Sequence, residues 1–258
     1  MANSKFDDRR VWDRFWAEKR VEGIYPPVTD IVSELRKLVK DFRYKKILEI
    51  GAGTGRTGIR LAELGGDVVL LDYSVNSLRM MRGLVEQGKK DVKLLLANAL
   101  STPLADESFD IIIHQGLLEH FKSPFVLLNE NIRLLKSGGY LLIDVPQTFH
   151  IYTLIKQALM LVNRWFGGWE RQFTVDSLSN LVKHYGLRIV HVYGDWSRPG
   201  LFYKIVRLGL AKFSIQLPMY PKYFGELTEK FYKVQTQLRN KRIFFYSVLS
   251  VGIIAQKG

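Results

Sequence analysis

The chain alternates short apolar runs with amphipathic stretches, a pattern typical of a sheet covered by helices. Residues 47–50 and 68–71 are apolar runs with the length of buried parallel strands. Between them, residues 57–64 carry apolar side chains at helical spacing, and Gly65-Gly66 predicts the end of that helix. This order predicts a right-handed crossover unit, and therefore an α/β fold with a doubly wound, mostly parallel sheet.

The second half of the chain continues the pattern up to a long interruption. Residues 187–196 predict a strand, and the β-branched and aromatic residues 243–258 predict its neighbour, which closes the chain. The stretch 197–242 between them is expected to be a helical insertion before the last strand. Within it, residues 201–213 place apolar side chains on one helical face and Lys204 and Arg207 on the other, as in a basic amphipathic helix.

A glycine-rich loop follows the first predicted strand. Gly51, Gly53 and Gly55 stand at alternate positions, and Asp72 follows at the end of the second strand. Glycines allow a sharp turn and close approach of a ligand, and a carboxylate at that place can accept hydrogen bonds from a ribose diol. A dinucleotide loop would carry its third glycine at the sixth position, where this chain has Arg56. A packed strand–helix turn without a ligand is the alternative.

Later segments narrow the choice. "LLLANALSTPLADESFDIIIHQGLLEHF" from Leu94 to Phe121 indicates strand, polar loop, strand and a turn into a helix, and "LLKSGGYLLIDVP" from Leu134 to Pro146 indicates a glycine turn before a strand. With the glycine loop and Asp72, these motifs resemble the class I S-adenosylmethionine-dependent methyltransferases, most of all the branch that includes the ubiquinone and menaquinone biosynthesis methyltransferases. The resemblance covers residues 44–146 and, more loosely, 168–190. It implies a Rossmann-like, seven-stranded sheet.

The resemblance also implies a binding site for S-adenosyl-L-methionine. The glycine loop would hold the methionine part of the cofactor, Asp72 its ribose and Tyr73 and Asn98 its adenine, with Gln115 near the methionine end. The family usually has an aspartate at Asn98, but an amide oxygen can also accept a hydrogen bond. The implied cofactor-binding residues are Glu49, Gly51, Ala52, Gly53, Thr54, Gly55, Asp72, Tyr73, Asn98, Ala99 and Gln115.

Methyl transfer needs few catalytic groups, because a sulfonium already makes the methyl group electrophilic. His120 is the candidate general base, and Glu119 is expected to orient or assist it. The alternative is that His120 only packs or caps at a helix start. Relatives in the quinone pathway link such a Glu-His pair to a metal ion, but Gly116 stands where the family's further acid would be, so we expect no metal site. His114 is expected to line the cofactor cavity, with Asp144 and Tyr152 as weaker candidates.

Composition bears on partners and location. The 258 residues contain no cysteine, which suits a reducing cytoplasm, and the charged N-terminal segment does not look like a signal peptide. The net charge is +13, and residues 151–258 contribute 16 basic against 5 acidic side chains. A basic, aromatic-rich half indicates an anionic membrane surface, nucleic acid or an acidic substrate; a solvated face is the alternative.

Together these features predict a cytoplasmic enzyme that methylates a small or lipid-like acceptor, with peripheral association with a membrane as a further hypothesis. An RNA methyltransferase that uses the basic half is one alternative, although no RNA-binding module is recognisable. A cofactor-binding regulatory protein without turnover is the other. The acceptor, the methylated atom and the oligomeric state are not specified by the sequence. A single domain is expected, with a lid at 1–43, a cofactor core at 44–146, acceptor-side helices at 147–186 and the basic insertion at 197–242.

Overall fold

The structure is a computed structural model of the chain, and it describes all residues except 1–8, 19–28, 89–90, 197–198, 221–224 and 239–240. The strands are β1 (Lys46–Ile50), β2 (Asp67–Asp72), β3 (Val92–Leu96), β4 (Phe109–Gln115), β5 (Leu135–Pro146), β6 (Arg188–Asp195) and β7 (Ser250–Gln256). The α-helices are α1 (Arg9–Ala17), α2 (Ile31–Arg36), α3 (Arg56–Glu63), α4 (Val75–Gly88), α5 (Pro124–Leu134), α6 (Ile151–Leu161), α7 (Val175–His184), α8 (Leu201–Ala211) and α9 (Gly225–Leu238), with 3-10 turns η2 (Leu118–His120) and η3 (Arg242–Tyr246).

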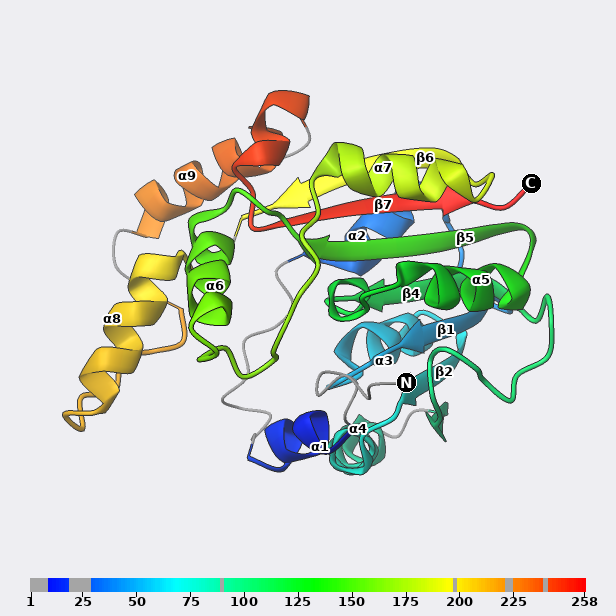
Figure 1. Ribbon diagram of the computed structural model, residues 1–258, viewed down its shortest axis with the longest axis horizontal. Helices are drawn as coiled ribbons and strands as arrows, with labels where there is room; N and C mark the ends of the chain where they lie inside the picture. The colour runs from blue at the N-terminus through cyan, green and yellow to red at the C-terminus, as the bar shows by residue number, and fades with distance from the viewer. Residues whose placement is uncertain (1–8, 19–28, 89–90, 197–198, 221–224, 239–240) are drawn as a thin grey trace.

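The strands form one seven-stranded sheet in the order β3-β2-β1-β4-β5-β7-β6 (Figure 1). β7 runs antiparallel to both of its neighbours, and the other pairs are parallel. The doubly wound, mostly parallel sheet predicted from the sequence is therefore confirmed.

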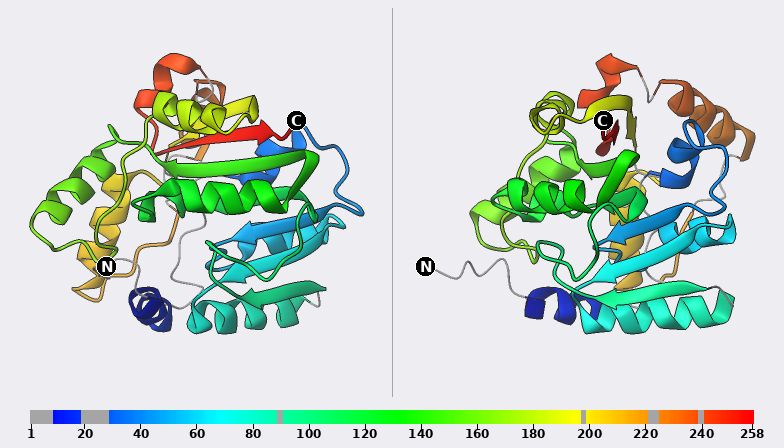
Figure 2. Two further views of the ribbon diagram at one scale, coloured as in Figure 1. Left: turned by 45° about the vertical axis from the view of Figure 1, so that its right-hand side comes forward. Right: turned by 90° about the vertical axis from the view of Figure 1, so that its right-hand side faces the viewer.

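Alternate residues of the central strands supply two hydrophobic cores, one on each face of the sheet. Leu48 and Ile112 belong to the core beneath α5 and α7, and Ile47 and Ile111 belong to the core beneath α2, α3 and α4. Because neighbouring side chains of a strand point to opposite faces, an apolar run without polar interruptions is what a strand covered on both sides requires. Figure 2 shows the resulting helix–sheet–helix layers.

The predicted closing strand is only partly a strand. Residues 250–256 pair with β5 and β6, so the expected pairing with 187–196 is present. The aromatic residues before them form η3 instead, so the strand assignment was wrong for Ile243 to Tyr246. Phe245 is buried there and packs with Val248, which shows that a tertiary contact overrode the β-propensity of this segment.

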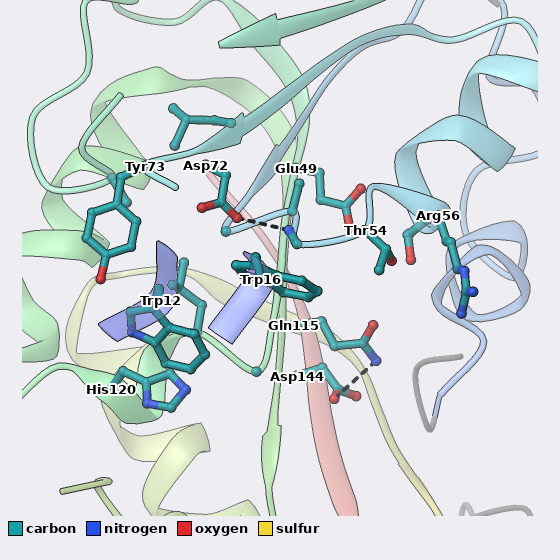
Figure 3. Close-up of a pocket in the computed structure, with 18 of the residues that line it drawn as sticks. Trp12, Trp16, Glu49, Thr54, Arg56, Asp72, Tyr73, Gln115, His120 and Asp144 are labelled. Atoms are coloured by element: carbon teal, nitrogen blue, oxygen red, sulfur yellow. Dashed lines mark hydrogen bonds between the residues drawn. The ribbon is translucent and has the colours of Figure 1, made fainter. Parts of the chain in front are cut away.

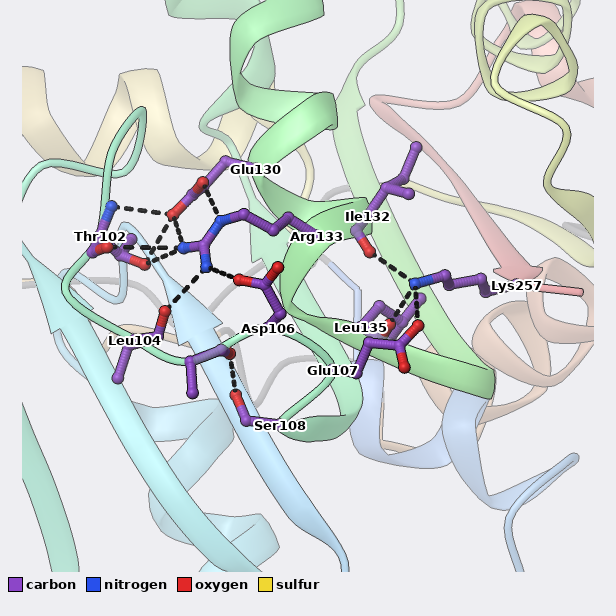
Figure 4. A network of polar contacts seen from close by, with 11 residues as sticks. Thr102, Leu104, Asp106, Glu107, Ser108, Glu130, Ile132, Arg133, Leu135 and Lys257 are labelled. Carbon is purple, nitrogen blue, oxygen red and sulfur yellow. Dashed lines mark hydrogen bonds and ion pairs between the residues drawn. The ribbon is translucent and has the colours of Figure 1, made fainter.

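The loop between β3 and β4, which begins at Asn98, is held to α5 by an ionic network (Figure 4). Arg133 Nε and Nη2 donate to the Glu130 carboxylate at 2.8 and 2.6 Å, and Nη1 donates to the carbonyl of Leu104 at 2.9 Å. Glu130 in turn accepts from the backbone and hydroxyl of Thr102 at 2.8 and 2.7 Å. Arg133 also pairs with Asp106. These contacts fix the segment that follows Asn98 at the edge of the sheet.

Arg133→Ala should lower the free energy of unfolding by about 1–3 kcal/mol at neutral pH, the scale of lost hydrogen bonds to a charged group. The hydrogen bonds from Arg133 lower the pKa of Glu130 from 4.5 to about 2. A carboxyl group whose pKa is lower in the folded state stabilises that state at pH values above the pKa of the unfolded chain. This stabilisation is lost as the pH falls and Glu130 becomes protonated. The difference between wild type and variant should therefore shrink as the pH falls from about 5 toward 2.

Urea denaturation at several pH values checks this, with Arg36→Ala as a control at an exposed arginine. An equal effect of both substitutions, or a difference that grows with acid, would contradict this role for the network.

Candidate active site

A cavity of about 610 Å³ opens at the carboxyl ends of β1, β2, β4 and β5 (Figure 3). This is where the strand order reverses between β2-β1 and β4-β5, the usual ligand position in open α/β sheets. It brings together most of the cofactor residues expected from the sequence: Glu49, Gly51, Ala52, Gly53, Thr54, Asp72, Tyr73, Asn98, Ala99 and Gln115. His120 lines the same cavity.

The glycine loop leaves bare backbone facing the cavity. Gly51 and Gly53 have φ of +63° and +56°, in the left-handed region that favours glycine. A Cβ on Gly53 would lie 2.8 Å from the indole of Trp16, and a Cβ on Gly51 would lie 2.8 Å from Leu117. Neither position has space for a side chain. Gly55, by contrast, is not among the lining residues; it caps α3 at φ +68°, over Leu70.

Two buried carboxylates hold this loop. Asp72 accepts from Gly53 N at 3.0 Å and from Ser74 N at 2.9 Å, and Glu49 accepts from Gly58 N at 2.7 Å. Burial raises the pKa of both, that of Glu49 to about 8, although the backbone hydrogen bonds oppose the change. Glu49 therefore fixes the first turn of α3, while Asp72 joins the loop to the end of β2 and keeps its carboxylate at the cavity wall.

Polar side chains continue along the strand ends. Asn98 uses Oδ1 to accept from Leu100 N at 2.9 Å, so its carbonyl oxygen partly serves its own turn. Gln115 donates to Asp144 Oδ1 at 3.4 Å. Asp144 is 3% exposed, and burial raises its pKa to about 7. Asp144 and Tyr152, which the sequence analysis gave as weaker candidates, both line the cavity.

Helix α1 covers the mouth of the cavity. Asp13 accepts from Ser74 Oγ at 2.6 Å and from Asn76 N at 3.2 Å, and its carbonyl accepts from Asn76 Nδ2 at 3.0 Å. These bonds place Trp16 against the glycine loop and Trp12 over His120, with ring centroids 4.7 Å apart. Residues 1–8 and 19–28 of the proposed lid, including Tyr25-Pro26-Pro27, lie outside the described residues, and α2 packs into the core on one face of the sheet.

His120 and Glu119 have different positions. His120 faces the cavity, and burial lowers its pKa to about 4, so the imidazole is neutral at physiological pH. Glu119 is 3% exposed and does not line the cavity; its Oε1 lies 4.0 Å from His120 Nε2. Burial, with the nearby charge of Glu170, raises the pKa of Glu119 to about 8 and favours the protonated acid. Glu119 can therefore act on His120 but does not contact a ligand in the cavity.

An aromatic wall continues from Trp12 beyond His120. The Phe166 ring stacks on Phe15 at 4.9 Å and lies 6.2 Å from Trp12, and Trp165 lies 6.3 Å from Tyr152. Behind this wall, Lys156 forms an ion pair with Glu170, although both are about 95% buried. Glu170 also accepts from Trp165 Nε1 at 2.7 Å, which fixes the indole.

The structure corrects one sequence expectation and adds further lining residues, among them Arg56 and Ser250. His114 is fully buried and does not line the cavity, because its side chain points from β4 into the protein interior; the expectation that it lines the cofactor cavity was wrong. Arg56 lines the cavity at the first position of α3, and its place directly after the glycine loop could have indicated this. Ser250 lines it from the distant end of the chain, and no local sequence pattern indicates this position.

Residues 48–143 match the family model of the methyltransferase domain. The ubiquinone biosynthesis O-methyltransferase of Ruegeria sp. (strain TM1040) is 29% identical over 162 residues, which cover 61% of this chain and 66% of the relative. The demethylmenaquinone methyltransferase of Renibacterium salmoninarum is 31% identical over 99 residues, 38% of this chain and 40% of the relative. The chain thus spans just under two thirds of the length of the first of these relatives.

Solved structures share the whole fold at low identity. A SAM-dependent methyltransferase from Aquifex aeolicus has a TM-score of 0.58 and 13% identity, with 97% of this chain and 99% of that chain covered. The [4+2]-cyclase SpnF has a TM-score of 0.59 and 16% identity, with 88% and 80% covered. Because a cyclase shares the fold, the fold alone does not fix the reaction.

Residues 48–143 carry a methyltransferase domain, and the relatives and the fold agree with that match. The resemblance to the class I S-adenosylmethionine-dependent methyltransferases, the enzyme class and S-adenosyl-L-methionine as the cofactor, all predicted from the sequence, are confirmed.

The residues present fit this cofactor. Gly51 and Gly53 offer a cradle that any Cβ would fill, and Asp72 supplies a buried carboxylate at the end of β2, about where a ribose would lie. Arg56 and Thr54 add polar groups at the start of α3, where backbone N–H groups favour a carboxylate.

Asp72→Ala should weaken binding of S-adenosylhomocysteine by about 1.5–3 kcal/mol, because both the ribose acceptor and the anchor of Gly53 are lost. Asp72→Asn, which keeps the shape and one acceptor oxygen, should lose less. Isothermal titration calorimetry measures both, with Asp91→Ala as the control at an exposed acid. Wild-type affinity in a folded Asp72→Ala protein would remove Asp72 from the cofactor site.

Proposed function

We propose that the protein methylates a hydroxyl group of an apolar, aromatic acceptor of the quinone-precursor type, presented at a membrane surface. The observation that carries the proposal is the placement of His120 and an aromatic wall in the same cavity as the glycine loop. The names of the two relatives, which refer to ubiquinone O-methylation and demethylmenaquinone methylation, support this class of acceptor.

The aromatic wall favours a flat, apolar acceptor over a charged one. Trp12, Phe121 and Tyr152 line the cavity, and Pro146 and Leu249 add apolar surface to it. Indole and phenol rings bind another ring by offset stacking or edge-to-face contact. The acidic side chains of this region, Asp144 and Glu119, have raised pKa values, which limits their negative charge near neutral pH.

S-adenosyl-L-methionine, when bound, supplies an electrophilic methyl group on its sulfonium. The glycine loop and Asp72 hold one reactant, and the aromatic wall orients the other, so most of the catalytic effect would come from alignment. The neutral His120 would accept the proton that the acceptor hydroxyl loses when its oxygen is methylated. Glu119, whose Oε1 lies 4.0 Å from His120 Nε2, would help to position the imidazole.

Exposed apolar side chains near the cavity support a membrane-bound acceptor. Helix α8 exposes Phe202 to 81% and Leu208 to 61%, and α6 ends in Leu161, which is 86% exposed. Both helices lie beyond the carboxyl ends of the parallel strands, at the same end of the molecule as the cavity (Figure 1). Arg207 turns back and donates to the carbonyl of Leu217 at 3.0 Å, whereas Lys212 is exposed. Exposed apolar groups beside cations suit an anionic interface.

No helix of the described residues is long and apolar enough to span a bilayer.

His120→Ala should reduce methyl transfer by roughly 10²–10⁴-fold while the affinity for S-adenosylhomocysteine changes little, because the base acts only on the acceptor proton. Since the pKa of His120 is about 4, its neutral form persists to acid pH, and the wild-type rate should not fall between about pH 8 and pH 6 through protonation of this group. Single-turnover transfer of radiolabelled methyl groups to phenolic quinone precursors measures the rate.

His150→Ala is the matched control, because this half-buried imidazole caps α6 outside the residues that line the cavity. Labelling of RNA but not of phenolic lipids would overturn the proposed acceptor. An unchanged rate in folded His120→Ala would assign His120 a packing role only.

Phe202→Gln should weaken partitioning to phosphatidylglycerol-containing vesicles about tenfold, because an inserted aromatic side chain contributes about 1–2 kcal/mol. Tyr44→Gln is the matched control. Tyr44 is 94% exposed, but it precedes β1 and therefore lies at the amino ends of the parallel strands, away from α8. Vesicle sedimentation measures both. Equal partitioning of both variants and wild type would exclude α8 from the interface.

A further inference from the structure

A second cavity lies on the outer side of the aromatic wall and has no part in the reaction described above. It encloses about 920 Å³ between the end of η2 and the chain that follows α6. Its lining includes Lys122, Asn163, Trp165, Trp169 and Arg171. The two cavities share no lining residue, and Trp165 and Phe166 stand between them.

The charge of this second cavity is one-sided. Among the described residues that line it, Lys122 and Arg171 are ionisable and none is acidic. Glu170 is next to Arg171 in the chain, but it is buried and its charge is compensated by Lys156. Among the described residues, no carboxylate forms an ion pair with Arg171. An anion bound here would therefore be attracted by two cations.

Arg171 is held in place by local contacts. Arg171 Nη1 donates to the carbonyl of Lys122 at 3.2 Å, its guanidinium carbon lies 5.9 Å from the Phe173 ring centroid, and its backbone N–H donates to the carbonyl of Glu119 at 2.6 Å. An arginine fixed in this way can bind a phosphate with little loss of side-chain entropy. The cavity is thus connected through the backbone to the residue beside His120.

The surroundings of the cavity are apolar and exposed. Leu161, Val162 and Phe166 are each more than half exposed, and Trp169 is 37% exposed at the rim. A tryptophan beside a cation, next to exposed aliphatic groups, is the arrangement found where a protein meets lipid head groups. A soluble anion would gain nothing from these apolar side chains, whereas a lipid would place its acyl chains along them.

We propose that this second cavity binds the phosphate head group of an anionic phospholipid and so sets the depth and orientation at which the catalytic cavity meets the membrane. Lys122 and Arg171 would contact the phosphate, and Trp165 would bridge the head-group cavity and the wall that holds Tyr152. The proposal deepens the membrane part of the proposed function and rests on it, but it makes no use of methyl transfer.

The test uses the full chain and vesicles of phosphatidylcholine with or without phosphatidylglycerol. The double variant Lys122→Gln, Arg171→Gln should bind anionic vesicles at least about tenfold more weakly than wild type. Each basic residue near such a surface raises the affinity about fivefold. The control is the double variant Lys45→Gln, Lys183→Gln, which removes the same charge from two exposed lysines near the amino ends of β1 and β6. Its affinity for the vesicles should be within about twofold of that of wild type.

Three outcomes would overturn the proposal. Equal losses in the two double variants would mean that only net charge matters. Competition by glycerol 3-phosphate as strong as that by vesicles would make the cavity a site for soluble anions. Loss of structured RNA binding, without a change in vesicle binding, would assign it to nucleic acid. Failure of the proposed function is distinguishable, because a chain that transfers no methyl group could still show the expected vesicle pattern.

Discussion

The carboxylate of Asp72 is the contact on which the site depends. It is 6% exposed, and it accepts from Gly53 N at 3.0 Å and from Ser74 N at 2.9 Å. The first bond fixes the glycine loop after β1, and the second fixes the turn into α4. The hydroxyl of that same Ser74 donates to Asp13, which docks α1 over the cavity. One buried acid at the end of β2 thus organises the loop, the turn and the cover, because an unpartnered carboxylate there would be costly.

A buried ion pair supports the aromatic wall of the cavity. Lys156 and Glu170 form a buried ion pair, and Glu170 also holds Trp165. Such a pair is weak evidence for stability, since desolvation offsets much of its attraction. It does fix the aromatic wall on which an acceptor would rest. The neutral His120 stands between this wall and the glycine loop, where a hydroxyl proton would have to leave.

The parts of the site that follow from sheet topology could be predicted from the sequence. β1 and β2 pair in parallel register, so the loop after Ile50 and the residue after Leu71 necessarily meet at one edge. His114 could not be placed in the same way, because strand periodicity does not say which face of β4 borders the cavity. The burial of Lys156 could not be predicted from the sequence either. Its partner Glu170 is in a loop, and a charged residue within an apolar run usually indicates an exposed position. η3 replaced the expected strand because Phe245 packs into the core.

The glycine loop and Asp72 should bind S-adenosyl-L-methionine rather than a dinucleotide. Calorimetric titration of the wild-type protein with S-adenosylhomocysteine and, separately, with NADH distinguishes the two ligands. We expect saturable binding of S-adenosylhomocysteine at one site and no heat of binding from NADH. Binding of NADH without binding of S-adenosylhomocysteine would show instead that the loop is a dinucleotide site.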